Sequence, residues 1–364
     1  MHYRLELFTI VGVIFCTLLP ASIAESKGLK EEGENELSSL SIKVEKKKTE
    51  EGIRGLEQFA NAPKKVTGKT QQSLSAQQST ELKEAQRLNQ RVLRLLREGK
   101  YNEGIPLAQK ALAIREKILG KEHPGTATSL NNLAAFYLYQ KNYSKAEPLY
   151  LRSLAISEKI LGKEHPDTAT SLNNLAEIYR SQRNYSKAKP LYLRSLSILE
   201  KVLGKEHPNV AASLNNLALM YQSQKNYNKA EPLYLRSLAI REKVFGKEHP
   251  DTAAILNNLA SLYSSQRNDN KAEQLYLQSL SILEKVLDEE HPNVAASLNN
   301  LAGVYEDQGN YSKAEPLYVR LLAIREKVLG KEHPDTATSL NGLAIFYKDQ
   351  GNYQKAEPLY VRSL

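Results

Sequence analysis

The dipeptide His-Pro occurs six times in this chain, and each copy lies 42 residues after the previous one. The residues around it recur with the same period. A period of about 20–50 residues is typical of stacked arrays in which each unit contacts only its neighbours. We therefore expect one repeat domain, although the length of 364 residues alone would suggest two or three globular domains. The histidines are His123, His165, His207, His249, His291 and His333.

Each repeat begins at an alanine and predicts two helices, so the expected fold class is all-α. In the first regular copy, which starts at Ala127, the first helix should run from about Thr126 to Gln140 and the second from Ser144 to Leu161. Apolar residues at helical spacing mark one face of each helix. Glycine and His-Pro after the second helix predict its end and a restart. The expected core residues are Leu130, Leu133, Ala134 and Tyr137, then Ala146, Tyr150, Ser153 and Leu154.

A capping box is predicted at the start of the second helix. Ser144 would accept a backbone N–H, and Glu147 would reach back to another. Ser312 and Glu315 repeat the pattern, whereas Lys189 replaces the glutamate in the second copy.

The N-terminal part of the chain differs from the repeats. Residues 1–24 have a basic start, an apolar stretch and a small-x-small end, which predicts a secretory signal peptide, with an uncleaved membrane anchor as the alternative. Residues 25–80 are rich in charge, Gln and Ser and have few apolar residues, which predicts a disordered tether. Helical patterning begins at about Glu81, so the array should occupy residues 81–364.

The two ends of the array depart from the regular repeat. The first unit is degenerate, with Arg91 and Gly104 where later copies have Leu and Ala, as expected of a terminal repeat. Five full repeats and part of a sixth follow, and the sequence stops at Leu364, midway through a second helix. An end-to-end contact between copies is expected there, unless the sequence is truncated.

The series L-x-x-L-A-x-x-Y followed by A-x-x-x-Y resembles the tetratricopeptide repeat. The long second helix and the L-G-K-E-H-P-D-T-A loop are similar to the 42-residue variety of kinesin light chains, from about residue 85 to 364. The resemblance implies a right-handed superhelical solenoid of antiparallel helix pairs, whose first helices line a groove that binds extended peptides of partner proteins.

The N-terminal segment argues against a role in motor transport. It carries an export signal, and residues 25–80 lack a coiled coil for a motor heavy chain. We therefore expect an exported bacterial relative, periplasmic or extracellular once the signal is removed, with no membrane contact in the mature form.

Asparagine at position 6 of the repeat, counted from its first alanine, is the main candidate for peptide binding. This position lies opposite the core positions of the first helix, and its amide can both donate and accept hydrogen bonds along a peptide backbone. The alternative is that these amides brace neighbouring helices. The candidates are Asn132, Asn174, Asn216, Asn258 and Asn300.

Positions 9, 12 and 13 vary between copies while the core positions barely change. Such variety would supply side-chain selectivity, and neutral drift at exposed sites is the alternative. Acidic and basic residues are mixed, which does not favour an acidic peptide in the groove. The candidates are Glu177 and Leu219 at position 9, Arg180 at position 12, and Tyr139 and Asp307 at position 13.

Several functions are not expected. The net charge of +9 is spread over alternating Lys and Glu, unlike the concentrated basic face of nucleic-acid binders. The His-Pro histidines lie in separate repeats about 10 Å apart, too far to share a metal ion. Neither a catalytic constellation nor a cofactor motif stands out. The recurring Arg152, Arg194, Arg236 and Arg320 indicate a solvated or ion-paired outer face.

The sequence therefore predicts a non-catalytic scaffold that binds a protein or peptide ligand in its groove. The alternative is a structural scaffold that self-associates through its last repeat.

Overall fold

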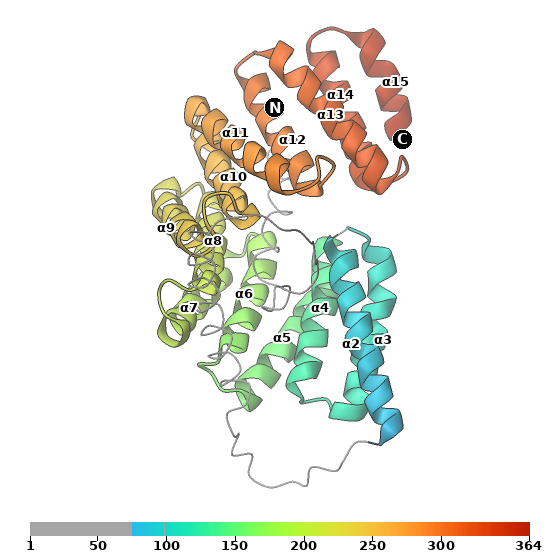
Figure 1. Ribbon diagram of the computed structural model, residues 1–364, viewed down its shortest axis with the longest axis vertical. Coiled ribbons are helices and arrows are strands. Elements are labelled where there is room, and N and C mark those ends of the chain that lie inside the picture. The colour runs from blue at the N-terminus through green and yellow to red at the C-terminus, as the bar shows by residue number, and fades with distance from the viewer. Residues whose placement is uncertain (1–74, 98) are drawn as a thin grey trace, which may run out of the picture. The chain divides into compact units, whose positions relative to one another are not determined.

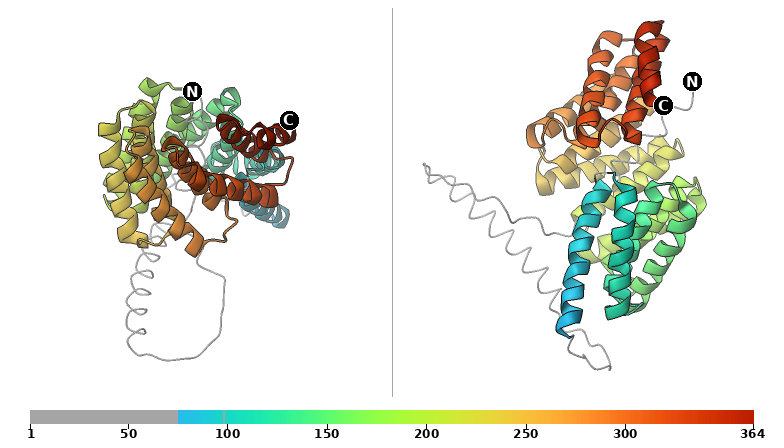
Figure 2. Two further views of the ribbon diagram at one scale, coloured as in Figure 1. Left: turned by 90° about the horizontal axis from the view of Figure 1, so that it is seen from above. Right: turned by 90° about the vertical axis from the view of Figure 1, so that its right-hand side faces the viewer.

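The computed structural model describes residues 75–97 and 99–364. This part of the chain consists of α-helices and contains no strand, which confirms the predicted fold class. Figure 1 and Figure 2 show each helix lying beside the one before it. The predicted signal peptide and residues 25–74 of the predicted tether lie outside the described residues. Helix α2 begins at Ala76 rather than at Glu81.

Fourteen helices form consecutive packed pairs in the described residues. The initial pair is α2 (Ala76–Arg97) and α3 (Tyr101–Leu119). The first helices of the regular repeats are α4 (Pro124–Tyr139), α6 (Pro166–Ser181), α8 (Pro208–Ser223), α10 (Pro250–Ser265), α12 (Pro292–Asp307) and α14 (Pro334–Asp349). The second helices are α5 (Tyr143–Ile160), α7 (Tyr185–Leu203), α9 (Tyr227–Phe245), α11 (Asp269–Val286), α13 (Tyr311–Leu329) and α15 (Tyr353–Ser363).

The first helix of every regular repeat begins at the His-Pro dipeptide, which confirms the predicted restart. The histidine is the N-cap residue, and its Nδ1 accepts the backbone N–H of the residue two positions later. In the first copy Gly125 N–H donates to His123 Nδ1 at 3.0 Å. Proline then occupies the first helical position, where its missing N–H leaves no bond unmade. The imidazole is thus a structural acceptor in six repeats.

The predicted capping box is wrong. The second helix begins at Tyr143, and Asn142 is its N-cap, with Asn142 Oδ1 accepting Lys145 N–H at 3.3 Å. The Ser144 hydroxyl donates to the same oxygen at 3.0 Å, and Ser312 does so to Asn310. Because the helix starts one residue earlier than expected, the serine lies inside its first turn. Glu147 and Glu315 are then free to contact the next repeat.

The predicted core positions hold. Leu130, Ala134 and Ala146 are fully buried, Leu133 and Tyr150 are nearly so, and Tyr137 and Leu154 pack half-buried against them. The Ser153 hydroxyl can be buried without an unmade hydrogen bond, because it donates to the Ala127 carbonyl at 3.0 Å. The same bond recurs in three later repeats. This bond ties the second helix to the start of its own first helix.

A glutamate, a tyrosine and a lysine join consecutive repeats. In the second copy the Tyr179 hydroxyl donates to Glu147 of the preceding helix at 2.8 Å, and Lys187 lies over the Tyr179 ring at 5.0 Å. Burial and the bond to Glu147 raise the pKa of Tyr179 to about 12, so this phenol stays a donor at neutral pH. The equivalent hydroxyl bonds join Tyr263 to Glu231, Tyr305 to Glu273 and Tyr347 to Glu315.

Lys189 interrupts this series, because it occupies the place of the glutamate that would face Tyr221. Lys189→Glu is expected to restore the hydroxyl–carboxylate bond and to raise the free energy of unfolding by about 0.5–1.5 kcal/mol. Urea denaturation followed by circular dichroism would measure the change. Lys189→Gln, which removes the positive charge without supplying a carboxylate, should give less than half the gain. Equal gains would attribute the effect to charge alone.

Gly104 of the degenerate first pair has a packing reason. Later repeats place alanine there, but a Cβ on Gly104 would lie 2.1 Å from Phe136 Cζ. The Phe136 ring therefore occupies the space of the missing side chain, and Ala108 stands where regular repeats have a buried tyrosine. The first repeat is thus degenerate because α3 has small residues at these two positions, while the Phe136 ring of α4 fills the space beside Gly104.

Gly104→Ala should therefore destabilise the N-terminal end of the array. Overpacking costs about 1–3 kcal/mol, and the better helix propensity of alanine offsets part of it, so a net loss of about 1 kcal/mol is expected. Adding Phe136→Leu, which copies Leu262 of the fourth repeat, should recover the loss. Hydrogen exchange of α3 would report both variants, and additive effects of the two changes would contradict the proposed clash.

The outer face carries the expected ion pairs. Arg152 Nη1 lies 2.6 Å from Glu116 Oε1, and Arg194 and Arg236 pair in the same way with the second helix of the preceding repeat. Arg320 and Arg362 continue the series with Glu284 and Glu326. These half-exposed pairs confirm an ion-paired surface.

Candidate peptide-binding surface

Two of the position-6 asparagines make hydrogen bonds between neighbouring repeats. Asn132 Nδ2 donates to Asn89 Oδ1 at 2.5 Å, and Asn258 Nδ2 donates to Asn215 Oδ1 at 2.8 Å. Both donors are more than nine-tenths buried, as is Asn216. Asn174 and Asn300 are half-buried. The bracing role that the sequence left open is therefore present for Asn132 and Asn258, while peptide binding by the set stays a prediction.

Three asparagines at position 5 carry buried acceptors without a partner. Among the described residues, the side-chain oxygens of Asn131, Asn173 and Asn257 are buried and accept no hydrogen bond, and the position-6 oxygen of Asn216 is in the same state. Asn257 is still held in place, because its Nδ2 donates to the Ser279 and Ser297 hydroxyls at 2.7 Å each. Position 5 precedes position 9 by four residues, so the two share a helix face. The repetition of both asparagines was visible in the sequence, but their difference in bonding was not.

Glu177 and Arg180 form a buried ion pair within α6. Arg180 Nε and Nη2 donate to the two carboxylate oxygens at 2.8 and 2.5 Å, and each side chain is 8 % exposed. The Tyr192 hydroxyl donates to Glu177 Oε2 at 2.8 Å, and Arg180 Nη1 donates to Ser223 at 3.3 Å. These two predicted specificity residues are thus engaged with each other and with the next helices.

Residues at positions 9 and 12 also accept hydrogen bonds from tyrosine hydroxyls, which the sequence did not reveal. In the second, third and fifth repeats, a polar residue at one of the two positions meets the hydroxyl of a tyrosine on the second helix. Tyr234 donates to Gln222 Oε1 at 2.7 Å, and Tyr318 donates to Glu306 Oε2 at 2.7 Å. Tyr192 uses Glu177 instead. Part of the variation at these positions therefore serves the core.

The remaining candidates lie in different surroundings. Leu219 is 1 % exposed. Tyr139 is half-buried and stacks on Tyr101, with ring centroids 5.2 Å apart. Asp307 is exposed and pairs with Arg267 at 3.5 Å. The structure does not gather the ten predicted residues into one cavity, and their binding role stays a prediction.

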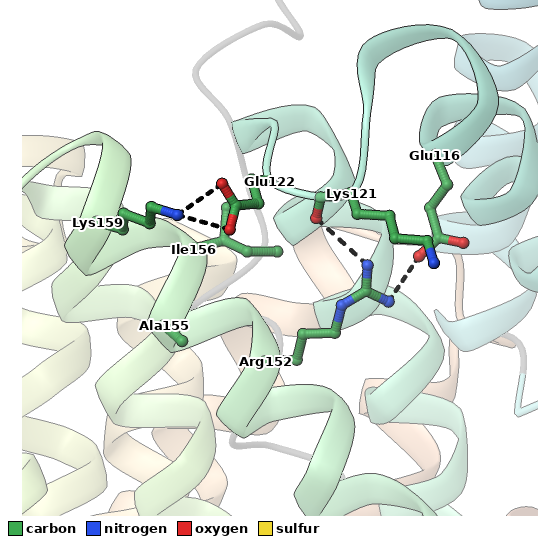
Figure 3. A pocket seen from close by; sticks show the side chains of 7 residues that line it. All are labelled: Glu116, Lys121, Glu122, Arg152, Ala155, Ile156 and Lys159. Atoms are coloured by element: carbon green, nitrogen blue, oxygen red, sulfur yellow. Dashed lines mark hydrogen bonds and ion pairs between the residues drawn. The ribbon is translucent and has the colours of Figure 1, made fainter.

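A hollow on the outer face is lined by charge pairs (Figure 3). Lys159 contacts both oxygens of Glu122 at 2.6 and 2.7 Å, and Arg152 spans Glu116 and the Lys121 carbonyl. Within the described residues no group of three or more His, Cys, Asp or Glu side chains could hold a metal ion. None of the described helices is long and apolar enough to cross a membrane.

Three solved structures are similar to this chain. A putative kinesin light chain with nearly identical TPR-like repeats from Podosopora anserina is 31% identical, covers 57% of this chain and 98% of its own, and gives a TM-score of 0.47. BtubC from P. vanneervenii is 23% identical over 66% of this chain and 92% of its own, with a TM-score of 0.49. The apo form of RapI is 21% identical over 77% and 96%, with a TM-score of 0.53.

The search of curated proteins found no match. The family model for the tetratricopeptide repeat matches six overlapping segments of the sequence, residues 84–158, 127–201, 174–243, 209–285, 270–327 and 293–364. Together these segments cover the array from its degenerate first pair to its last helix. The chain therefore belongs to the tetratricopeptide repeat family, whose members typically act as protein-interaction scaffolds.

Proposed function

We propose that this array is a non-catalytic scaffold that binds an extended peptide segment of a partner protein along the first helices of its repeats. The observation that carries the proposal is the row of partnerless amide oxygens at position 5. A buried acceptor without a hydrogen bond costs about 1–3 kcal/mol. A donor supplied by a ligand would remove that cost once the side chains that cover these oxygens move aside.

An extended peptide backbone suits this row. The acceptors of Asn131, Asn173 and Asn257 recur on first helices of different repeats, so the ligand must reach several repeats at once. A peptide backbone presents N–H donors regardless of its sequence, and the varied residues at positions 9, 12 and 13 would then add side-chain selectivity. The position-6 amides of Asn132 and Asn258 hold the neighbouring repeats in register.

The test separates the two kinds of asparagine. Peptides selected from a random library on the immobilised array would be measured by fluorescence anisotropy against wild type and against Asn131→Ala/Asn173→Ala. Two lost hydrogen bonds of about 0.5–1.5 kcal/mol each should weaken the Kd about tenfold. The melting temperature should fall less than in the control described next, because the two oxygens removed have no partner in the described chain.

Asn132→Ala/Asn258→Ala is the matched control. It removes two amides that are bonded within the protein, so it should lower the melting temperature. If the control weakens peptide binding as much as the position-5 variant, the position-5 amides do not contact the peptide. A library that yields no binder would also contradict the proposal.

Self-association through the last repeat is the second candidate. On α15, Tyr353 and Val361 each expose 67% of their surface, more than other large apolar side chains of the described helices apart from Leu364. Sedimentation equilibrium of wild type beside Tyr353→Ser/Val361→Ser would test it. A monomer at every concentration would rule it out.

A further inference from the structure

A row of four basic residues lies at the turns between the first and second helices of four consecutive repeats. Each residue follows the first helix and directly precedes the asparagine that caps the second. We call Lys141, Arg183, Lys225 and Arg267 the basic row. All four are exposed.

The backbone at these positions favours glycine, because it is left-handed. The φ angles of the four basic residues lie between 57° and 61°. In the first copy, Lys141 N–H donates to Leu138 O at 2.9 Å and Asn142 N–H to Tyr137 O at 2.7 Å, the hydrogen bonds of a helix end that usually places glycine there. L side chains other than Asn and Asp rarely adopt this conformation.

The chain itself shows that glycine fits this turn. Gly99, Gly309 and Gly351 occupy the equivalent position in the initial pair and in the fifth and sixth repeats, with φ of 70°, 72° and 74°. Four neighbouring repeats nevertheless place a cation there. Because residues held in such sparsely populated conformations cluster at functional sites, the side chains of the row are candidates for a function outside the turn.

A lysine lies four residues after every row member and over a tyrosine ring. These lysines are Lys145, Lys187, Lys229 and Lys271, at 4.8–5.6 Å from the ring centroids. The last turns of α12 and α14, in the repeats that have glycine at the turn, expose Asp307 and Asp349. Arg267 shows how a carboxylate meets the row, because Asp307 Oδ2 lies 3.5 Å from its Nη1.

We propose that the basic row binds an acidic segment of a partner protein, at an edge of the array separate from the first-helix surface. The first helices of neighbouring repeats contact each other, α4 with α6, α6 with α8 and α8 with α10, so row members at their ends are spaced by roughly one helix packing distance of about 10 Å. In an extended polyproline II chain, with three residues per turn and a rise of about 3.1 Å per residue, side chains three residues apart share one face and match that spacing. The ligand is thus an extended segment with Asp or Glu at every third position.

A glycine variant tests the row without risk to the fold. The probe is a fluorescent peptide of repeated Glu-Ser-Gly, measured by anisotropy at low salt. Changing all four row residues to glycine should weaken its Kd about tenfold, since exposed ion pairs contribute little singly but add up over four. The same variant should melt at a higher temperature than wild type, because glycine relieves the left-handed backbone.

The control removes four charges elsewhere. Lys121, Lys163, Lys205 and Lys247 lie in the loops after the second helices, and changing them to glutamine lowers the net charge by the same amount. This variant should keep the Kd of wild type. If both variants lose affinity for the probe equally, net charge alone explains the binding and the proposal is wrong. A wild type that does not bind the probe would also overturn it. Row-dependent binding to phosphatidylserine vesicles in place of the peptide would assign the row to a lipid surface instead.

Discussion

Glu177→Ala is expected to lower the free energy of unfolding by about 3–5 kcal/mol, the cost of leaving one member of a buried ion pair without its partner. The carboxylate accepts two bonds from Arg180 and one from the Tyr192 hydroxyl. Without it, the Arg180 guanidinium would keep its charge in a site where it is 8 % exposed. Urea denaturation followed by circular dichroism, with hydrogen exchange of α6 and α7, would locate the loss.

The fourth repeat supplies the control for this prediction. It places Ser261 and Ser264 where α6 has Glu177 and Arg180. Glu177→Ser/Arg180→Ser should therefore cost less than Glu177→Ala alone, since no charge stays buried and a serine can serve the Tyr192 hydroxyl as Ser261 does near Tyr276. A single variant that loses less than about 1 kcal/mol would show that the pair is solvated and weak.

The repeat period predicted the helices and the core of this protein because both depend on residue spacing. Leu130, Ala134 and Tyr150 recur at helical intervals, and their burial follows from that pattern alone. The start of each first helix at His-Pro was equally predictable from the sequence. The N-cap of the second helix was not predictable, because Ser144 and Glu147 fit a capping box, whereas Asn142, two residues earlier, accepts Lys145 N–H and caps the helix instead.

The candidate site was less predictable because its residues act across repeats. Variation at positions 9 and 12 suggested ligand selectivity, but Gln222 and Glu306 meet tyrosine hydroxyls of their own repeats. The sequence could pair neither Asn132 with Asn89 nor Tyr179 with Glu147, since each bond joins residues of different repeats. A pattern repeated along one chain fixes which residues share a helix face, and the stacking of repeats decides which of them are free.

The histidine caps make the stability of the array depend on pH. An imidazole accepts a hydrogen bond at Nδ1 only while that nitrogen carries no proton. His207 and His291 accept from Asn209 and Asn293 N–H at 3.1 Å each. Burial, and then the positive charge of Arg241, lower the pKa of His207. Burial also lowers the pKa of His291, against a smaller opposing effect of Asp288.

The lowered pKa values set the direction of the effect. In the unfolded chain these histidines take up protons as the pH falls through about 6.5, whereas in the folded array they resist protonation to a lower pH. The unfolded state then binds more protons. The free energy of unfolding therefore decreases as the pH decreases, by up to about 1.4 kcal/mol per pH unit for each proton. The contribution of the two caps is complete above about pH 7 and is lost below 6.5, with a total of about 2 kcal/mol at about 1 kcal/mol per cap.

Urea denaturation at a series of values between about pH 8 and 5.5 would measure this slope above the range in which most carboxylates titrate. In His207→Asn/His291→Asn the asparagines should keep both caps without a titrating group, because asparagine is among the best N-cap residues. The variant should match wild type at pH 8 and exceed its stability at pH 5.5. Parallel pH profiles for the two proteins would show that the caps bear protons equally in the folded and unfolded states, contrary to the geometry of the Nδ1 bonds.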